Sequence, residues 1–156
     1  RAFSLVPEYL VTEDGDQALN YMDYGLQLGR RFRALKLWMV VRAFGADGIA
    51  DRIRHHCQLA RTFADWVSAA GDGWQVCAPV PFSTICFRHV PEGETDEQQI
   101  ADHNATIMAQ VNESGKVFIS HTKLGDQYVL RVAIGNLRTT EATLATAWAL
   151  LRHAGR

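Results

Sequence analysis

The chain of 156 residues lacks the features of membrane-spanning and disulfide-stabilised proteins. Its longest apolar run, residues 37–41, is far shorter than the roughly 20 residues that a transmembrane helix needs. The three cysteines include no Cys-x-x-Cys pair, which favours reduced, buried thiols in a cytoplasmic protein and argues against a metal site. The net charge is only −1, with acids and bases interspersed, so nothing points to a nucleic-acid or membrane partner.

Apolar periodicity and turn residues predict alternating helices and strands. Residues 1–27 lack a strong period and are interpreted as a loop, with a short strand near residues 17–22. Helices are expected at residues 29–44, 46–70 and 96–114 and from Thr140 onward, and strands at residues 74–78, 83–90, 117–123 and 127–134. Gly45 is expected to end the first helix. This order predicts an α+β fold with helices packed on a small antiparallel sheet.

The first predicted helix is apolar around almost its whole circumference. One small sheet cannot cover all of that surface, and soluble monomers seldom expose so large an apolar patch. We therefore expect this helix to pack against a larger domain or a second subunit.

Four segments then suggest a family: FSLVPEYL at residues 3–10, LGRRFRALKLW at 28–38, ICFR at 85–88 and YVLRVAI at 128–134. In this order they resemble the carboxy-terminal third of the pyridoxal-phosphate-dependent group II amino-acid decarboxylases, which include the aromatic-L-amino-acid and histidine decarboxylases. The resemblance implies a fold-type I enzyme of which this chain forms the small carboxy-terminal α+β domain. Residues 1–27 would be the active-site loop and linker, residues 28–70 a helical connection to the large domain and the dimer interface, and residues 71–156 the small domain.

The same resemblance implies pyridoxal 5'-phosphate as cofactor, held as a Schiff base by a lysine that follows a histidine. The lysines of this chain are Lys36, Lys116 and Lys123, and none follows a histidine. The cofactor-binding lysine is therefore expected upstream of Arg1, in a large domain of the same protein. A cytoplasmic homodimer acting on an aromatic L-amino acid is the implied assembly.

Tyr9 is the catalytic residue that the resemblance implies. In the family, a tyrosine at this loop position protonates the carbon that loses carbon dioxide, whereas related aldehyde synthases carry phenylalanine. A phenol with a pKa of about 10 keeps its proton at neutral pH and can donate it in a closed site. The alternative is that Tyr9 is a loop aromatic that packs on the surface.

Leu28, Gly29 and Arg131 are the candidate binding residues. The resemblance places Leu28 and Gly29 beside the cofactor and the substrate ring, and Gly29 resembles the aromatic enzymes where histidine decarboxylases have serine. Arg131 resembles a strand arginine that binds the substrate carboxylate in glutamate decarboxylases, although a structural ion pair is an equal alternative. His103, His121 and His153 show no partner spacing and are interpreted as surface or sheet residues.

Two classes of function remain open from the sequence. The first is a lyase fragment, the carboxy-terminal part of an aromatic amino-acid decarboxylase, with an aromatic aldehyde synthase or the histidine and glutamate decarboxylase branches as variants. The second is a non-catalytic α+β dimerisation module, which the missing cofactor lysine favours. The FSLVPEYL segment favours the enzyme, because a module that only dimerises has no need of it.

Overall fold

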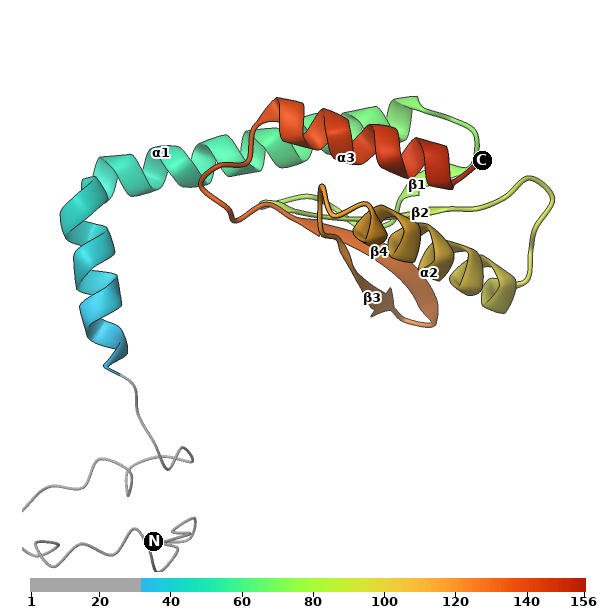
Figure 1. The fold of residues 1–156 in the computed structure, drawn as a ribbon, viewed down its shortest axis with the longest axis horizontal. Helices are drawn as coiled ribbons and strands as arrows, with labels where there is room; N and C mark the ends of the chain where they lie inside the picture. The colour runs from blue at the N-terminus through green and yellow to red at the C-terminus, as the bar shows by residue number, and fades with distance from the viewer. Residues whose placement is uncertain (1–31) are drawn as a thin grey trace, which may run out of the picture. The chain divides into compact units, whose positions relative to one another are not determined.

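The computed structural model describes residues 32–156, which form three helices and one antiparallel sheet (Figure 1). In chain order the elements are α1 (Arg33–Ala69), β1 (Trp74–Val76), β2 (Thr84–His89), α2 (Glu97–Glu113), β3 (Ser120–Leu124), β4 (Gln127–Ala133) and α3 (Glu141–Ala154). The predicted α+β class and the predicted order of elements are both confirmed. The strand expected near residues 17–22 lies outside the described residues.

Gly45 interrupts α1, as the sequence predicts. The chain divides into two compact units, residues 1–46 and 47–156, and the division falls next to this glycine. Gly45 has φ 67° and ψ 175°, a non-helical conformation that essentially only glycine adopts without strain. The expected helices over residues 29–44 and 46–70 are therefore seen as the two segments of α1, as far as the described residues reach.

The sheet of the second unit has the strand order β1-β2-β4-β3, and every neighbouring pair is antiparallel. Two cross-strand pairs, Ile85 with Val132 and Phe87 with Leu130, belong to the buried core. Because side chains alternate along a strand, the intervening pair of Cys86 and Arg131 projects from the opposite face. This two-residue period is the signal that identifies residues 83–90 and 127–134 as strands.

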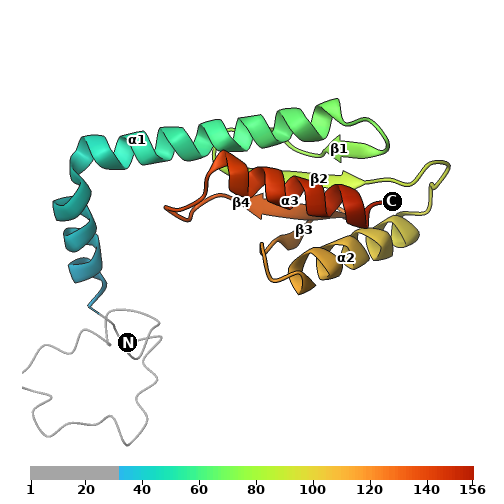
Figure 2. The ribbon, with the colours of Figure 1, turned by 45° about the horizontal axis from the view of Figure 1, so that its top comes forward.

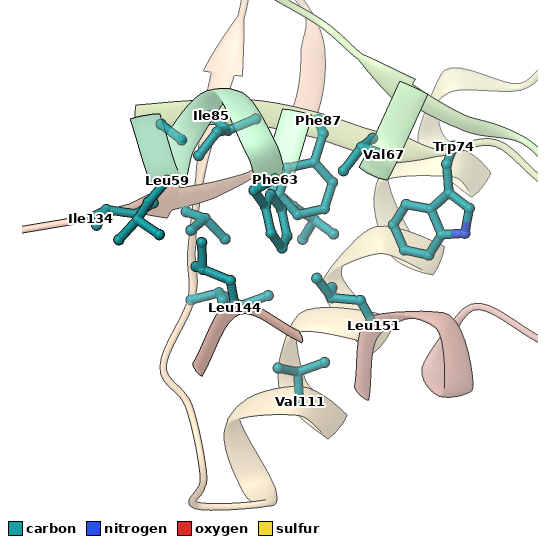
Figure 3. Packing of buried hydrophobic residues seen from close by; sticks show 14 of the residues in the cluster. Leu59, Phe63, Val67, Trp74, Ile85, Phe87, Val111, Ile134, Leu144 and Leu151 are labelled. Carbon is teal, nitrogen blue, oxygen red and sulfur yellow. The ribbon is translucent and has the colours of Figure 1, made fainter. Parts of the chain in front are cut away.

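The core lies between the sheet and three helical segments, with Phe63 of α1 at its centre (Figure 3). The ring of Phe63 packs edge-on against Phe87 at 5.6 Å and against Trp148 at 5.8 Å between ring centroids. Core residues come from α1 after Gly45, from α2 and from α3, so these helices share one face of the sheet (Figure 2). The strand residues of this core all project from that one face of the sheet.

Side-chain caps fix where α2 and α3 begin. Asp96 accepts hydrogen bonds from the backbone N–H groups of Gln98 at 2.8 Å and Gln99 at 3.3 Å, which lowers the pKa of its carboxyl. Thr140, where the sequence predicts the last helix to begin, caps α3 in a reciprocal pair with Thr143. These caps satisfy backbone donors that would otherwise have no partner at a helix start.

The expectation that the cysteines are buried is wrong. Cys57, Cys77 and Cys86 are free thiols of intermediate exposure. Cys77 and Cys86 lie on the side of the strands opposite the core, whereas their neighbours Val76 and Phe87 pack in or against the core. Within residues 32–156 no helix is both long and apolar enough to cross a bilayer.

Candidate functional site

Three of the four predicted site residues, Tyr9, Leu28 and Gly29, lie outside the described residues. Their roles therefore stay predictions. Arg131, the fourth, lies on β4 between the buried residues Leu130 and Val132. Among the predicted site residues, the geometry can therefore be described for Arg131 alone.

Arg131 occupies the face of the sheet opposite the hydrophobic core. Its cross-strand partners are Cys86 on β2 and Ser120 on β3. The residue is exposed, and within the described part of the chain its guanidinium makes no hydrogen bond or ion pair. Arg131 therefore does not form, among residues 32–156, the structural ion pair that the sequence left as an alternative. A free guanidinium on a rigid strand is suited to two-pronged binding of a carboxylate.

Arg88, on the same face of the sheet, differs from Arg131 because its guanidinium is hydrogen-bonded. Its Nη1 donates to both carboxylate oxygens of Glu97, at 3.1 and 3.0 Å, and its Nε donates to the side-chain oxygen of Gln75 at 3.4 Å. Only 12% of the Arg88 side chain is exposed. Of these two guanidinium groups, Arg131 is the one available to an external anion.

A partly buried polar cluster joins the end of β2 to α2. The side chain of Asn104, fully buried, accepts from the backbone N–H of His89 at 2.9 Å and donates to the His89 carbonyl at 2.8 Å. His89 Nδ1 lies 2.8 Å from His103 Nε2, and His89 Nε2 lies 2.7 Å from the carbonyl oxygen of Asp72. The interpretation of His103 as an unpartnered surface or sheet residue is therefore wrong.

The partners of the two imidazoles determine where their hydrogens lie. A carbonyl can only accept, so His89 Nε2 carries a hydrogen and donates it to Asp72. With this hydrogen on Nε2, the Nδ1 atom of His89 accepts from His103 Nε2. Burial, and then repulsion between the two imidazoles when both carry a proton, lowers the pKa of His103. This cluster ties the α1–β1 turn, β2 and α2 together, and we interpret it as structural.

This pair predicts a stability that depends on pH. Because the pKa of folded His103 lies below its unfolded value, the unfolded chain binds the proton more readily as pH falls. We expect the free energy of unfolding to decline as pH drops below about 6.5, the ordinary histidine pKa. His103→Gln should flatten this decline in urea titrations, and His153→Gln, on the exposed side of α3, is the matched control. An unchanged slope for His103→Gln would contradict the assignment.

The described residues do not fit a complete pyridoxal-phosphate site. Lys36, Lys116 and Lys123 are all exposed and lie on α1, after α2 and on β3. A pocket of about 210 Å³ includes Lys123, but carboxylates of Glu97, Asp102 and Asp126 line it and would repel a phosphate. Within residues 32–156 there is also no cluster of three or more His, Cys, Asp and Glu side chains able to hold a metal ion.

Comparison with known proteins identifies the class. The family model described as "Pyridoxal-dependent decarboxylase conserved domain" matches residues 1–90, more than half of the chain. The chain therefore belongs to the pyridoxal-dependent decarboxylase family, as the four sequence segments predict, and the cofactor of this family is pyridoxal phosphate. The match includes the segments that contain Tyr9 and Gly29.

Similar relatives are plant enzymes of aromatic amino acids. The chain is 41% identical over 153 residues to tyrosine decarboxylase 2 of Arabidopsis thaliana, covering 96% of this chain and 28% of that protein. It is 38% identical over 153 residues to phenylacetaldehyde synthase of the same plant, covering 97% of this chain and 31% of that one. The crystal structure of Oryza sativa TDC with PLP and tryptamine matches with a TM-score of 0.74 and 32% identity, covering 98% of this chain and 32% of that one. The chain spans about 30% of these proteins' lengths.

Proposed function

We propose that this chain is the carboxy-terminal part of a pyridoxal-phosphate-dependent decarboxylase that converts an aromatic L-amino acid to its amine and carbon dioxide. The observation that carries the proposal is the similarity of almost the whole chain to a tyrosine decarboxylase. The proposed protein carries the cofactor-binding lysine in a large domain upstream of Arg1. Residues 1–27 serve as active-site loop and linker, residues 28–70 connect to the large domain and to the dimer partner, and residues 71–156 form the small domain.

The exposed apolar surface of the first unit supports the proposed large domain and homodimer. Phe32, Leu37 and Trp38 are 74%, 66% and 60% exposed. Side chains of this size gain about 1.5–3 kcal/mol each when they are fully buried, so a helix that exposes several of them is favoured to bind an apolar partner.

In the proposed reaction, each site residue has one task. The Tyr9 hydroxyl donates a proton to the substrate carbon after carbon dioxide leaves. Gly29 leaves room for an aromatic ring, and Leu28 and Gly29 contact the cofactor or that ring. Arg131 binds the substrate carboxylate, a role that its free guanidinium on β4 supports. A cytoplasmic location remains part of this proposal.

The test is an assay of the complete protein loaded with pyridoxal phosphate. Tyrosine, tryptophan, phenylalanine and DOPA are offered separately, and amine and carbon dioxide are measured together. Equal amounts of amine and carbon dioxide from at least one of them are expected. If a cofactor-loaded protein forms neither product, the decarboxylase proposal fails and a non-catalytic dimerisation module becomes the better explanation.

The second candidate function is an aromatic aldehyde synthase, because phenylacetaldehyde synthase is among the similar relatives. The same assay separates the two functions: a synthase releases aldehyde and ammonia where a decarboxylase releases amine. Tyr9 favours the decarboxylase, since the resemblance assigns phenylalanine at this position to the synthases.

Gly29→Ser is expected to change which ring the enzyme prefers. A side chain added where an aromatic ring sits disfavours the large indole more than the small imidazole. Steric differences of this kind are worth about 1–3 kcal/mol, so kcat/KM for tryptophan relative to histidine should fall roughly tenfold or more. Gly25→Ser provides the control in the same segment. An unchanged ratio would remove Gly29 from the pocket.

A further inference from the structure

Cys77 and Cys86 lie directly opposite each other at the edge of the sheet. The backbone N–H of Cys77 donates to the Cys86 carbonyl at 2.8 Å and continues the register of β1 and β2 by one pair. The preceding pair, Val76 and Phe87, points into the core. Strand alternation therefore directs both thiols to the face opposite the core, where both residues are partly exposed.

We propose that Cys77 and Cys86 form a reversible redox-modification site, a dithiol that closes to a disulfide by exchange with a small-molecule disulfide such as oxidised glutathione. No role in the proposed decarboxylase reaction requires either residue. The inference rests on the strand register and on the exposure of the two thiols, and it holds whatever the enzyme acts on.

Strand geometry permits a disulfide between Cys77 and Cys86, but the disulfide would be strained. In hydrogen-bonded antiparallel pairs the Cα atoms are about 5.5 Å apart, inside the roughly 4.4–6.8 Å range of disulfides. The Cβ atoms of opposite residues are about 4.5–5.5 Å apart, slightly beyond the roughly 3.5–4.5 Å that a disulfide needs. Closure therefore requires a small inward movement of one strand. β1 can make it, because it has three residues, lies at the sheet edge and ends just before Cys77.

A strained disulfide is also easily reduced, so this bond would be reversible rather than permanent.

The environment of Cys77 determines which of the two cysteines attacks oxidised glutathione first. Burial raises the pKa of the Cys77 thiol, against an opposing effect of Arg88, and its Sγ lies 3.5 Å from the Gln75 carbonyl. Cys77 is therefore a poor first nucleophile, because the thiolate is the attacking form.

The exchange balances in two steps. The Cys86 thiolate attacks one sulfur of oxidised glutathione, forms a mixed disulfide and releases one glutathione thiolate. Cys77 then loses its proton to solvent and attacks the Cys86 sulfur, which releases the second glutathione. The two protein thiols are oxidised, and one glutathione disulfide is reduced to two thiols.

The sequence makes this bond simple to detect. No lysine or arginine lies between Thr62 and Arg88, so trypsin leaves both cysteines in one peptide, while Cys57 falls in the preceding peptide, residues 55–61. The full-length protein is incubated with oxidised glutathione, alkylated with iodoacetamide and digested with trypsin, and the masses of the peptides are measured by mass spectrometry. We expect peptide 62–88 to lose two hydrogens and to escape alkylation, and dithiothreitol to reverse both changes. Cys57→Ser should leave this result unchanged, whereas Cys77→Ser should leave glutathione attached to Cys86.

A parallel sample in urea separates native pairing from chance closure in a flexible chain. The proposal requires the native protein to close faster than the unfolded one, because the register holds the thiols together. It is overturned if peptide 62–88 from the native protein is alkylated at both cysteines, if it carries glutathione without closing, or if only the unfolded chain closes.

Discussion

Replacing Tyr9 with phenylalanine is expected to stop amine formation and to start release of aldehyde and ammonia, with dissolved dioxygen as the two-electron oxidant that is reduced to hydrogen peroxide. Phenylalanine keeps the ring but has no hydroxyl, so the carbon that loses carbon dioxide no longer receives a proton from this position. General acids contribute about 10²–10⁴-fold to such steps, so the amine rate should fall at least ~100-fold. The phenol suits this task because its ordinary pKa of about 10 keeps it protonated at neutral pH.

Product ratios decide this prediction better than rates do, because a merely structural role would lower all products together. Amine, aldehyde and ammonia are measured with the complete cofactor-loaded enzyme, at equal cofactor content for each variant. Tyr21→Phe makes the same chemical change in the same segment and should still yield amine. If Tyr9→Phe makes amine at the normal rate, Tyr9 is not the proton donor.

The fold was largely predictable because its signals are local. Residues 83–90 alternate between core and surface, so a two-residue period is visible without knowledge of the partner strand. Thr140 and Gly45 mark helix ends through their own chemistry, a hydroxyl that accepts backbone hydrogen bonds and a conformation that only glycine tolerates. The sheet order β1-β2-β4-β3 is not a local property, and no pattern within a single segment of the sequence predicts it.

The pair of His89 and His103 escaped prediction because its members meet only in the folded chain. His89 is 14 residues from His103, on a strand and a helix, so no spacing rule connects them. A weaker signal was present: His89 continues the inward-facing series of Ile85 and Phe87, and Asn104 falls between Ile100 and Ile107 on the buried side of α2. Polar residues at core positions need partners, which predicts a hydrogen-bonded cluster without naming its members.

The candidate site was predictable only through resemblance. Tyr9 and Gly29 have no spacing or periodicity that indicates chemistry. The family model that matches residues 1–90 supports the family assignment of these segments, but it does not test the catalytic role of Tyr9 or the binding role of Gly29. Arg131 differs, because an exposed arginine between Leu130 and Val132 on a strand is a feature of the residues themselves. Its carboxylate-binding role still requires a substrate brought to this face of the sheet, which residues 32–156 cannot supply alone.

Gly73→Ala is expected to be the most destabilising single-methyl change in the small domain. Gly73 has φ 82°, a conformation that costs an L-residue about 1–2 kcal/mol. The added Cβ would also overlap the carbonyl oxygen of Val90 and lie 3.3 Å from His89 Nε2. The strands cannot simply separate, because Val90 N–H donates to the Gly73 carbonyl at 2.9 Å, a bond worth about 1 kcal/mol.

We therefore expect Gly73→Ala to lower the free energy of unfolding by about 3 kcal/mol, and calorimetry should show a melting temperature lower by roughly 10 °C or more. Gly71→Ala is the matched control two residues earlier. Gly71 also has a positive φ, 62°, but nothing lies within 4 Å of the position that its Cβ would take. Its substitution should cost the backbone strain alone, about 1 kcal/mol. Equal losses for the two variants would mean that strain, and not the close approach of the α1–β1 turn to β2, makes glycine necessary at residue 73.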